Sequence, residues 1–294
     1  KKGEIDKLSK IISPNVGVIT NISYAHIKNF KNLNGIAEAK SEIIDHICKN
    51  GYIVLNKDDK FYNYFKNKAI KKNLKIISFG KSKKSDISVY KVHKIKKNLY
   101  LKIKFKNNIY TFKINKQSIL YLNNILGVIG VLTIFLDLRQ LNKNIFLSYK
   151  PLEGRGDLKK VRFMKKSINI IDESYNSNPL SLDFAIKKYN SISMDKNNKI
   201  MLLGDMLELG KHSKKLHIQA SNTINKSNID KVYVYGKHIR HTFNKIKTQK
   251  RGKILKNISE IKKFLKFDLF NGDYLMIKAS NSTGLNSIVS EIKK

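Results

Sequence analysis

The chain is poor in cysteine and in long apolar runs. Its only cysteine among 294 residues is Cys48, so no disulfide can form within the chain, and a reducing compartment is indicated. Residues 1–6 are mostly charged and lack the apolar core of a secretory signal. The longest apolar stretch, residues 125–136, is shorter than the about 20 residues that a membrane-spanning helix needs. We therefore expect a cytoplasmic protein without membrane insertion.

Arginine and acidic residues are scarce beside lysine. Lys and Arg together number 59 and Asp and Glu 22, which gives a formal net charge of +37. The arginines are Arg139, Arg155, Arg162, Arg240 and Arg251. Because base reading favours arginine and the lysines are spread along the whole chain, we expect no specific nucleic-acid partner. A general attraction to anionic substrates follows from the charge, and a basic nucleic-acid-binding protein stays open as an alternative.

Two common phosphate-binding glycine motifs are missing. Gly80, Lys81 and Ser82 match the end of a Walker sequence, but Lys75 stands where its first glycine belongs. The chain also contains no Gly-x-Gly-x-x-Gly. We therefore interpret Gly80–Ser82 as a chance match.

Apolar segments alternate with helical patterns through residues 1–150. Residues 16–22, 51–56 and 74–80 read as strands of a sheet covered on both faces, and residues 35–48 read as a helix. Alternating side chains over 87–114, with a turn at Asn107 and Asn108, predict an antiparallel hairpin. A helix over 117–138 is expected to end this first domain.

The second half, residues 151–294, has a more regular alternation of strands and helices. Residues 148–157 hold a proline and two glycines and read as a linker between domains. The expected strands are 167–172, 199–203, 231–236 and 273–278, and the expected helices are 180–189, 214–224, 258–267 and 283–292. This alternation predicts an α/β domain with a mostly parallel, doubly wound sheet.

Polar residues follow several of these strands. His26 comes just after the first strand, and residues 172–179 and 204–210 follow two strands of the second half. Ligands bind at such strand ends in open α/β sheets. Turn and helix-cap chemistry explains the same residue types equally well.

Six groups of residues, in this order along the chain, resemble the motifs of the Mur ligase family. They are Thr20–His26, Ala37–Glu42, Val54–Asp59, Glu153–Gly156, Asp172–Pro179 and Leu203–Gly210. The resemblance implies a central ATPase domain with a mixed sheet and hairpin over 1–150, followed by a Rossmann-like domain over 151–294. It further implies a preceding UDP-sugar domain and a Walker loop before residue 1, so this chain alone is expected to be inactive.

The resemblance also implies a reaction. Mur ligases activate a carboxylate with ATP as an acyl phosphate, which an amine then attacks to form an amide. Residues 203–210 are most similar to the branch that adds D-alanyl-D-alanine to a UDP-MurNAc-peptide in peptidoglycan synthesis. ATP, Mg²⁺ and a carbamylated lysine are implied as cofactors, and a monomer is expected.

The implied site residues lie in both halves. His26 and Lys40, the latter as a carbamate, would hold the metal, and with Arg155 they form the catalytic set. The implied nucleotide-binding residues are Asn56, Asp59, Asn124, Arg155 and Asp172. The implied substrate-binding residues are Tyr175, Asn176, Asn178, Lys278 and Ser280. Leu120, Ala279 and Asn281 depart from the family pattern, which has His, Gly and Arg at these positions.

Alternatives within the same chemistry are a diaminopimelate- or lysine-adding ligase and a folylpolyglutamate synthetase. The chain has no Asp-Asn-Pro-Arg signature, which argues against the diaminopimelate enzyme. A non-catalytic Rossmann-like scaffold is the alternative from another class.

Overall fold

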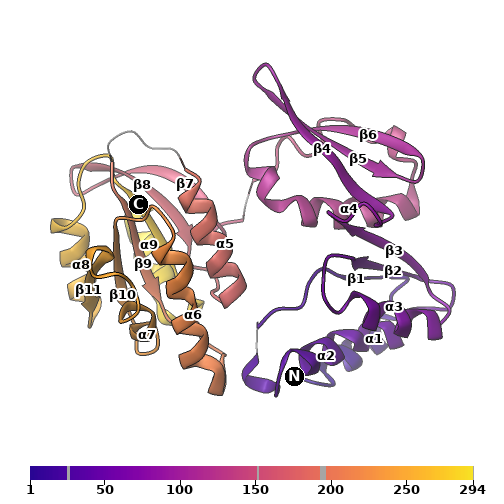
Figure 1. The fold of residues 1–294 in the computed structure, drawn as a ribbon, viewed down its shortest axis with the longest axis horizontal. Coiled ribbons are helices and arrows are strands. Elements are labelled where there is room, and N and C mark those ends of the chain that lie inside the picture. The colour runs from indigo at the N-terminus through magenta and orange to yellow at the C-terminus, as the bar shows by residue number, and fades with distance from the viewer. Residues whose placement is uncertain (25–26, 151, 193–196, 294) are drawn as a thin grey trace. The chain divides into compact units, whose positions relative to one another are not determined.

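The computed structural model describes residues 1–24, 27–150, 152–192 and 197–293. The chain forms two compact units (Figure 1). The first contains Lys1–Ser23 and Phe30–Lys150, and the second contains Tyr24–Asn29 and Pro151–Lys294. Among the described residues, no helix combines the length and the apolar character needed to cross a membrane.

The first unit is built on a six-stranded sheet in the order β1-β2-β3-β4-β5-β6. The strands are β1 (Val16–Ile19), β2 (Tyr52–Asn56), β3 (Lys75–Gly80), β4 (Ile87–Ile95), β5 (Asn98–Phe105) and β6 (Asn108–Ile114). The helices are α1 (Glu4–Ile12), α2 (Leu33–Asp45), α3 (Tyr62–Lys71) and α4 (Leu122–Phe135), with short 3₁₀ turns at η2 (Gln117–Tyr121) and η3 (Leu138–Gln140). The strands from β1 to β4 pair in parallel, and β4, β5 and β6 pair antiparallel. This mixed sheet confirms the predicted fold class.

Helix α4 occupies one face of this sheet, and α2 and α3 lie on the other (Figure 1). Val54 packs with Ile125, Leu126 and Ile129 of α4 in the main core, whereas Ile53 points to the opposite face. Gly130 permits the closest approach, because a Cβ there would lie 2.8 Å from Val54. Gly127 lies against Phe79, near the end of β3. Helix α4 therefore begins at the carboxyl edge of the parallel strands.

The second unit has a six-stranded sheet in the order β11-β10-β9-β12-β8-β7, parallel except for the β7–β8 pair. Its strands are β7 (Asp157–Phe163), β8 (Lys166–Glu173), β9 (Lys199–Gly204), β10 (Lys231–Tyr235), β11 (Arg251–Leu255) and β12 (Tyr274–Lys278). Its helices are α5 (Pro179–Asn190), α6 (Ser213–Asn225), α7 (Arg240–Phe243), α8 (Ile258–Phe267) and α9 (Leu285–Lys293). Short 3₁₀ turns lie at η1 (Ile27–Asn29), η4 (Gly210–His212), η5 (Thr248–Lys250) and η6 (Asn281–Thr283).

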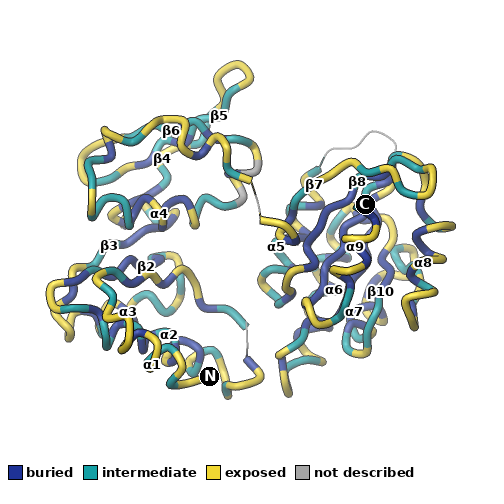
Figure 2. Tube along the Cα trace, turned by 180° about the vertical axis from the view of Figure 1, so that it is seen from behind, coloured by how far each residue is buried: buried dark blue, intermediate teal, exposed yellow. Residues whose placement is uncertain are grey.

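Both faces of the second sheet are covered. Alternate residues of β8, β9 and β12, such as Ile170, Leu202 and Ile277, join the core under α8 and α9. The residues between them, such as Met201 and Met276, are equally buried on the other face. Figure 2 shows dark blue over the second half of β8 and the middle of β10. The doubly wound sheet predicted for this half is therefore confirmed.

Two strands of this sheet, β7 and β11, were not predicted from the sequence. Both are edge strands, and their side chains are mostly exposed or half-buried. In the first unit, β4 adds a third strand to the predicted hairpin, and a bulge between Val89 and Lys91 breaks its alternation. Strands are predicted from the alternation of apolar and polar side chains, and this alternation is lost in exposed edge strands and at bulges.

Candidate functional site

Lys40, Asn56 and Asp59 come together at the carboxyl edge of β1 and β2. Lys40 lies on α2, and its Nζ donates to the carbonyl of Asn21, 2.9 Å away. Asn32 caps this helix by accepting from Gly35 N. The helix therefore directs the half-buried lysine toward the loop that follows β1.

Asn56 and Asp59 hold that same loop. The Asn56 amide donates to the carbonyl of Thr20 (2.8 Å), and its oxygen accepts from Asp58 N (2.9 Å). The Asp59 carboxylate accepts from Ile22 N (2.7 Å) and from Phe61 N (2.9 Å). These bonds join the loop after β1 to the loop after β2, so the three predicted residues form one polar cluster.

Burial changes the chemistry of Lys40. Removal from water lowers the pKa of its ammonium group, and the negative charge of Asp59 opposes this shift only partly. A larger fraction of Lys40 is therefore a neutral amine near neutral pH, which is the form that reacts with CO₂ to give a carbamate.

The predicted metal ligands are His26 and Lys40, and the structure describes Lys40 alone of the two. His26 lies outside the described residues. Among those that are described, no group of three His, Cys, Asp or Glu side chains is placed to hold a metal ion. Mg²⁺ prefers oxygen ligands, and a carbamate on Lys40 would add two oxygens to this cluster. Lys40 thus fits the implied metal as a carbamate, whereas its unmodified amine does not.

Asn124 belongs to the first turn of α4 and is exposed. Because α4 begins at the carboxyl edge of the strands, Asn124 lies at the same edge of the sheet as Asn56. The neighbouring Asn123 has a buried side-chain oxygen with no partner among the described residues.

In the second unit, Arg155 lies in a short loop, Leu152–Asp157, that we call the arginine loop. Its guanidinium group stacks over the ring of Tyr175, 4.3 Å from the ring centre. Gly154 (φ +73°) and Gly156 (φ +93°) flank the arginine in a backbone conformation that favours glycine. Gly156 N donates to the carbonyl of Asp172 (2.6 Å), so the loop lies beside the end of β8.

Asp172, at the end of β8, is 3% exposed. One carboxylate oxygen accepts from Ser174 N (3.1 Å) and from Ser174 Oγ (2.6 Å). The other lies 2.6 Å from Lys293 Nζ. The Asp172 carboxylate therefore has three donor atoms around it, from Ser174 and Lys293.

Lys278, at the end of β12, is 1% exposed. Its Nζ donates to the carbonyl of Asn176 (3.1 Å) and lies 3.4 Å from the Glu173 carboxylate. Burial lowers the pKa of Lys278, Glu173 opposes the shift, and the nearby Arg155 and Lys188 add to it. The end of β8 thus carries one buried carboxylate, Glu173, and the end of β12 places the Lys278 ammonium group beside it.

Ser280 and Asn178 have clear local partners. Ser280 Oγ donates to the carbonyl of Ser177 (3.3 Å) and accepts from Leu207 N (2.9 Å), so it links the loops after β8 and β9. Asn178 forms a capping box with Ser181 at the start of α5. The structure therefore gives Asn178 a capping role at the start of α5.

Sequence reasoning missed three charged residues of this region. Glu173 follows Asp172 directly, and its position at a strand end could have indicated it. Lys188 donates to the carbonyl of Gly156 (2.9 Å), and Lys293 reaches Glu153, Asp157 and Asp172. No signal marks these two lysines, because lysines occur along the whole chain and only the fold shows which ones turn inward.

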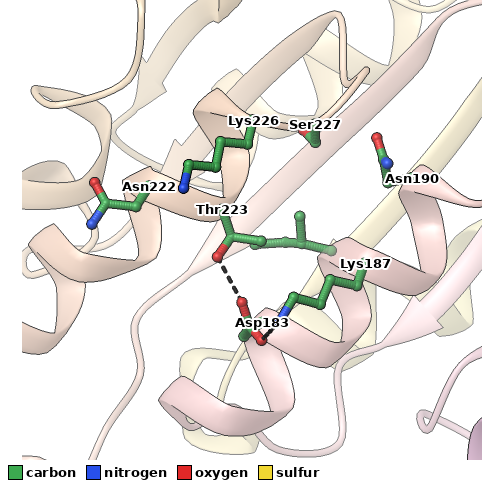
Figure 3. Close-up of a pocket in the computed structure, with 8 residues that line it drawn as sticks. Asp183, Lys187, Asn190, Asn222, Thr223, Lys226 and Ser227 are labelled. Carbon is green, nitrogen blue, oxygen red and sulfur yellow. Dashed lines mark hydrogen bonds and ion pairs between the residues drawn. The ribbon is translucent and has the colours of Figure 1, made fainter.

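A separate cavity of about 280 Å³ lies between α5 and α6. It is lined by Asp183, Ile186, Lys187, Asn190, Asn222, Thr223, Lys226 and Ser227 (Figure 3). Thr223 donates to Asp183 at 2.6 Å, and Lys187 pairs with the same carboxylate. This cavity holds none of the predicted site residues.

Both units have polar clusters at the carboxyl ends of parallel strands. The protein is therefore of the open α/β class, in which ligands bind at these strand ends. The Mur ligase middle domain matches residues 1–132, and the "Mur ligase, glutamate ligase domain" matches residues 157–281. The chain belongs to the Mur ligase family.

Similar proteins cover nearly the whole chain. The UDP-N-acetylmuramoyl-tripeptide–D-alanyl-D-alanine ligase of Rickettsia prowazekii is 30% identical over 298 residues, which is 98% of this chain and 63% of that protein. The enzyme of the same name from Buchnera aphidicola subsp. Baizongia pistaciae is 30% identical over 99% of this chain and 61% of its own length. The chain thus spans about three fifths of these curated relatives.

Solved structures share the fold. MurF from Acinetobacter baumannii superposes with a TM-score of 0.81 at 21% identity, covering 99% of this chain and 62% of that one. MurF ligase from Thermotoga maritima, solved in complex with ADP, gives a TM-score of 0.76 at 23% identity over 100% of this chain and 65% of its own.

Proposed function

We propose that the protein containing this chain is an ATP-dependent amide ligase that joins D-alanyl-D-alanine to UDP-MurNAc-tripeptide through an acyl phosphate. The observation that carries the proposal is the match, at 30% identity over 98% of the chain, to a ligase named for this reaction. The polar clusters at the two carboxyl edges supply suitable chemistry. We place the reaction in the cytoplasmic stage of peptidoglycan synthesis and expect a monomeric enzyme, which sedimentation of the gene product tests.

Charge placement supports the phosphate roles. Arg155 is proposed to contact the ATP phosphates, because its planar fork can bind two oxygens at once. Asn56, Asp59 and Asn124 lie at the same edge of the first sheet and are proposed to contact the nucleotide. Phosphoryl transfer needs such positioning and charge neutralisation more than covalent help from the protein.

Mg²⁺ is proposed to be held by His26 and by Lys40 as its carbamate. The ion supplies neutralising charge for the phosphate oxygens when it is bound. The structure supports this assignment through the half-buried Lys40 amine and its lowered pKa. Asn56 and Asp59 hold the backbone of the loop after β1 through Thr20 and Ile22.

The remaining residues are proposed to bind ribose and peptide. An ionised carboxylate has about four acceptor positions, and three bonds from Ser174 and Lys293 leave Asp172 one for a ribose hydroxyl. Tyr175 and Asn176 are exposed beside the arginine loop, where an incoming substrate can contact them. Asn178, Lys278 and Ser280 border the same strand ends and are proposed to shape the substrate site.

The test is ADP release by the gene product that contains this chain. We expect release that requires ATP, UDP-MurNAc-tripeptide and D-alanyl-D-alanine together. A panel of single amino acids, including L-alanine, glutamate, lysine and diaminopimelate, replaces the dipeptide in parallel reactions. Absence of ADP release with the dipeptide, or faster release with one of the amino acids, would contradict the proposal.

A further inference from the structure

The backbone on both sides of Arg155 is fixed by hydrogen bonds. Gly156 N donates to the carbonyl of Asp172 (2.6 Å), and Tyr175 N donates to the carbonyl of Gly154 (3.2 Å). Within the arginine loop, Arg155 N donates to the carbonyl of Leu152 (3.0 Å). The side chain of Arg155 is itself exposed. The direction of its guanidinium group therefore depends on the shape of the loop together with the Tyr175 ring on which it stacks.

Lys188 of α5 holds one end of this loop. Its Nζ donates to the carbonyl of Gly156 at 2.9 Å. Gly156 is so closely covered that a Cβ there would collide with Lys188 Nζ and lie 2.5 Å from the Glu173 carboxylate. Burial lowers the pKa of Lys188, and Glu173 and Asp157 oppose the shift. A charged donor in such a half-buried place makes a stronger hydrogen bond than a neutral one.

Lys293 of α9 holds the other side of the loop. Its Nζ lies 3.1 Å from Asp157, 3.5 Å from Glu153 and 2.6 Å from Asp172. Burial alone would lower the pKa of Lys293, but the carboxylates of Asp172 and Asp157 outweigh it and raise the pKa. Helices from opposite faces of the sheet thus each supply one ammonium group to the same short loop.

We propose that Lys188 and Lys293 are positioning residues that clamp the arginine loop and so fix the place of Arg155. The functional consequence rests on the phosphate role proposed for Arg155. The clamp itself is a property of the loop, and it can be measured without any reaction.

Lys187 provides a matched control for Lys188. It is the preceding residue on α5, it carries the same charge, and it is exposed. It pairs with Asp183 at 2.6 Å beside the cavity between α5 and α6 (Figure 3). The variants Lys188→Met and Lys187→Met therefore remove the same charge from the same helix, and only the first removes a contact to the arginine loop.

The measurement is cleavage of the full gene product by an arginine-specific protease. Cleavage after Arg155 requires the loop to open, and the product is a fragment that begins at Gly156. We expect Lys188→Met to raise this rate about tenfold, the effect of losing one charged hydrogen bond on the open population. Lys187→Met should stay within about twofold of the wild type. Cleavage after Arg162, Arg240 and Arg251 is the internal reference for folding.

Equal cleavage after Arg155 in the two folded variants would overturn the clamp. If Lys188→Met does not fold, as circular dichroism will show, Lys293→Met takes its place. Its control is Lys262→Met, an exposed lysine that pairs with Glu291 at 2.8 Å. Equal cleavage of this second pair would likewise overturn the proposal.

ADP release then separates the clamp from the proposed function. With the clamp in place, we expect Lys188→Met to lower kcat/KM for ATP about tenfold and to leave the KM for D-alanyl-D-alanine within about twofold. A wild type that releases no ADP contradicts the proposed function, and the cleavage rates still decide the clamp. Faster cleavage with unchanged kcat/KM for ATP would overturn the positioning role of Lys188.

Discussion

Burial lowers the pKa of Lys40, as it does for Lys188 and Lys278. We predict that Lys40→Arg lowers the rate of ADP release about a hundredfold or more, because arginine keeps a positive charge where a metal-binding carbamate is proposed. The control is Lys68→Arg, a half-buried lysine of the same unit that pairs with Asp45 at 2.6 Å. In ¹³C-bicarbonate, NMR of the wild type should show a carbamate carbon signal that Lys40→Arg lacks. A signal that persists in Lys40→Arg would contradict the assignment.

His217 makes the second unit sensitive to acid. The ring is fully buried, its Nδ1 donates to the carbonyl of Ser213 (2.8 Å), and its Nε2 accepts from Met206 N (3.1 Å). Burial lowers the pKa of His217 below its ordinary 6.5. Protons therefore bind His217 more readily in the unfolded chain, so the contribution of His217 to stability is complete above about pH 6.5 and is lost as the pH drops toward the lowered pKa.

We predict that the free energy of urea unfolding decreases from pH 7 to about pH 5. His217→Gln should weaken this dependence, whereas His241→Gln, a half-buried histidine nearby, should leave it in place. A pH dependence that is the same in His217→Gln and in the wild type would contradict the role of His217.

The candidate site could be predicted only in part at this scale. The resemblance to the Mur ligase family implied site roles for Lys40, Asn56 and Asp59, and the structure brings these three together at one sheet edge. Lys188 and Lys293 could not be predicted, because their partners Gly156 and Asp172 lie far away in sequence. Long-range pairing of that kind leaves no mark in local residue spacing.

Among the helices, α5 and α8 of the second unit begin with the same cap. Asn178 accepts from Ser181 N (3.0 Å), and Asn257 accepts from Glu260 N (2.9 Å). We predict that Asn178→Ala and Asn257→Ala each lower the free energy of unfolding by about 1 kcal/mol, since each removes one helix cap.

Comparing the two variants separates stability from function. Urea unfolding should give similar losses for both. If Asn178 also contacts substrate, only Asn178→Ala should raise the KM for a substrate, as measured by ADP release. Equal KM values in the two variants would restrict Asn178 to its capping role.

In the second sheet, strand prediction succeeded in the interior and failed at the two edges. Strands β9 and β12 are buried on both faces, so their apolar runs identify them with nearly the observed bounds. Strand β7 has exposed Lys159, Lys160 and Arg162, and its pairing with β8 depends on the partner rather than on its own apolar period. An edge strand with one neighbour needs little apolar surface.

At the scale of the whole molecule, one short segment from the first half of the chain belongs to the second unit. Its local sequence does not indicate this. The segment around Lys28 belongs to the second unit, where Lys28 N donates to the carbonyl of Glu208 (2.8 Å). Gly210 (φ +52°) permits this approach, because a Cβ there would lie 3.2 Å from Lys28 Cα. The placement of this segment in the second unit depends on tertiary contacts and cannot be read from local sequence.

The net charge of the whole chain also affects its stability. With 59 basic and 22 acidic residues, most basic side chains have no acidic counterpart to pair with. We predict that NaCl raises the urea midpoint of unfolding between about 0.01 M and about 0.1 M, where the Debye length falls from about 30 Å to about 10 Å. Glucose at equal osmolality is the control. A midpoint that falls with NaCl would mean that attractive ion pairs outweigh the repulsion.

The position of β12 has a consequence for synthesis of the protein. Of the six strands of this sheet, β12 is the last to leave the ribosome, yet it lies between β9 and β8 in the middle of the sheet. Until Lys278 has emerged, the nascent chain holds two half-sheets that expose apolar strand faces and unpaired edges. A premature stop codon before Tyr274 would therefore remove the centre of the unit rather than its rim, and would leave a product prone to aggregate.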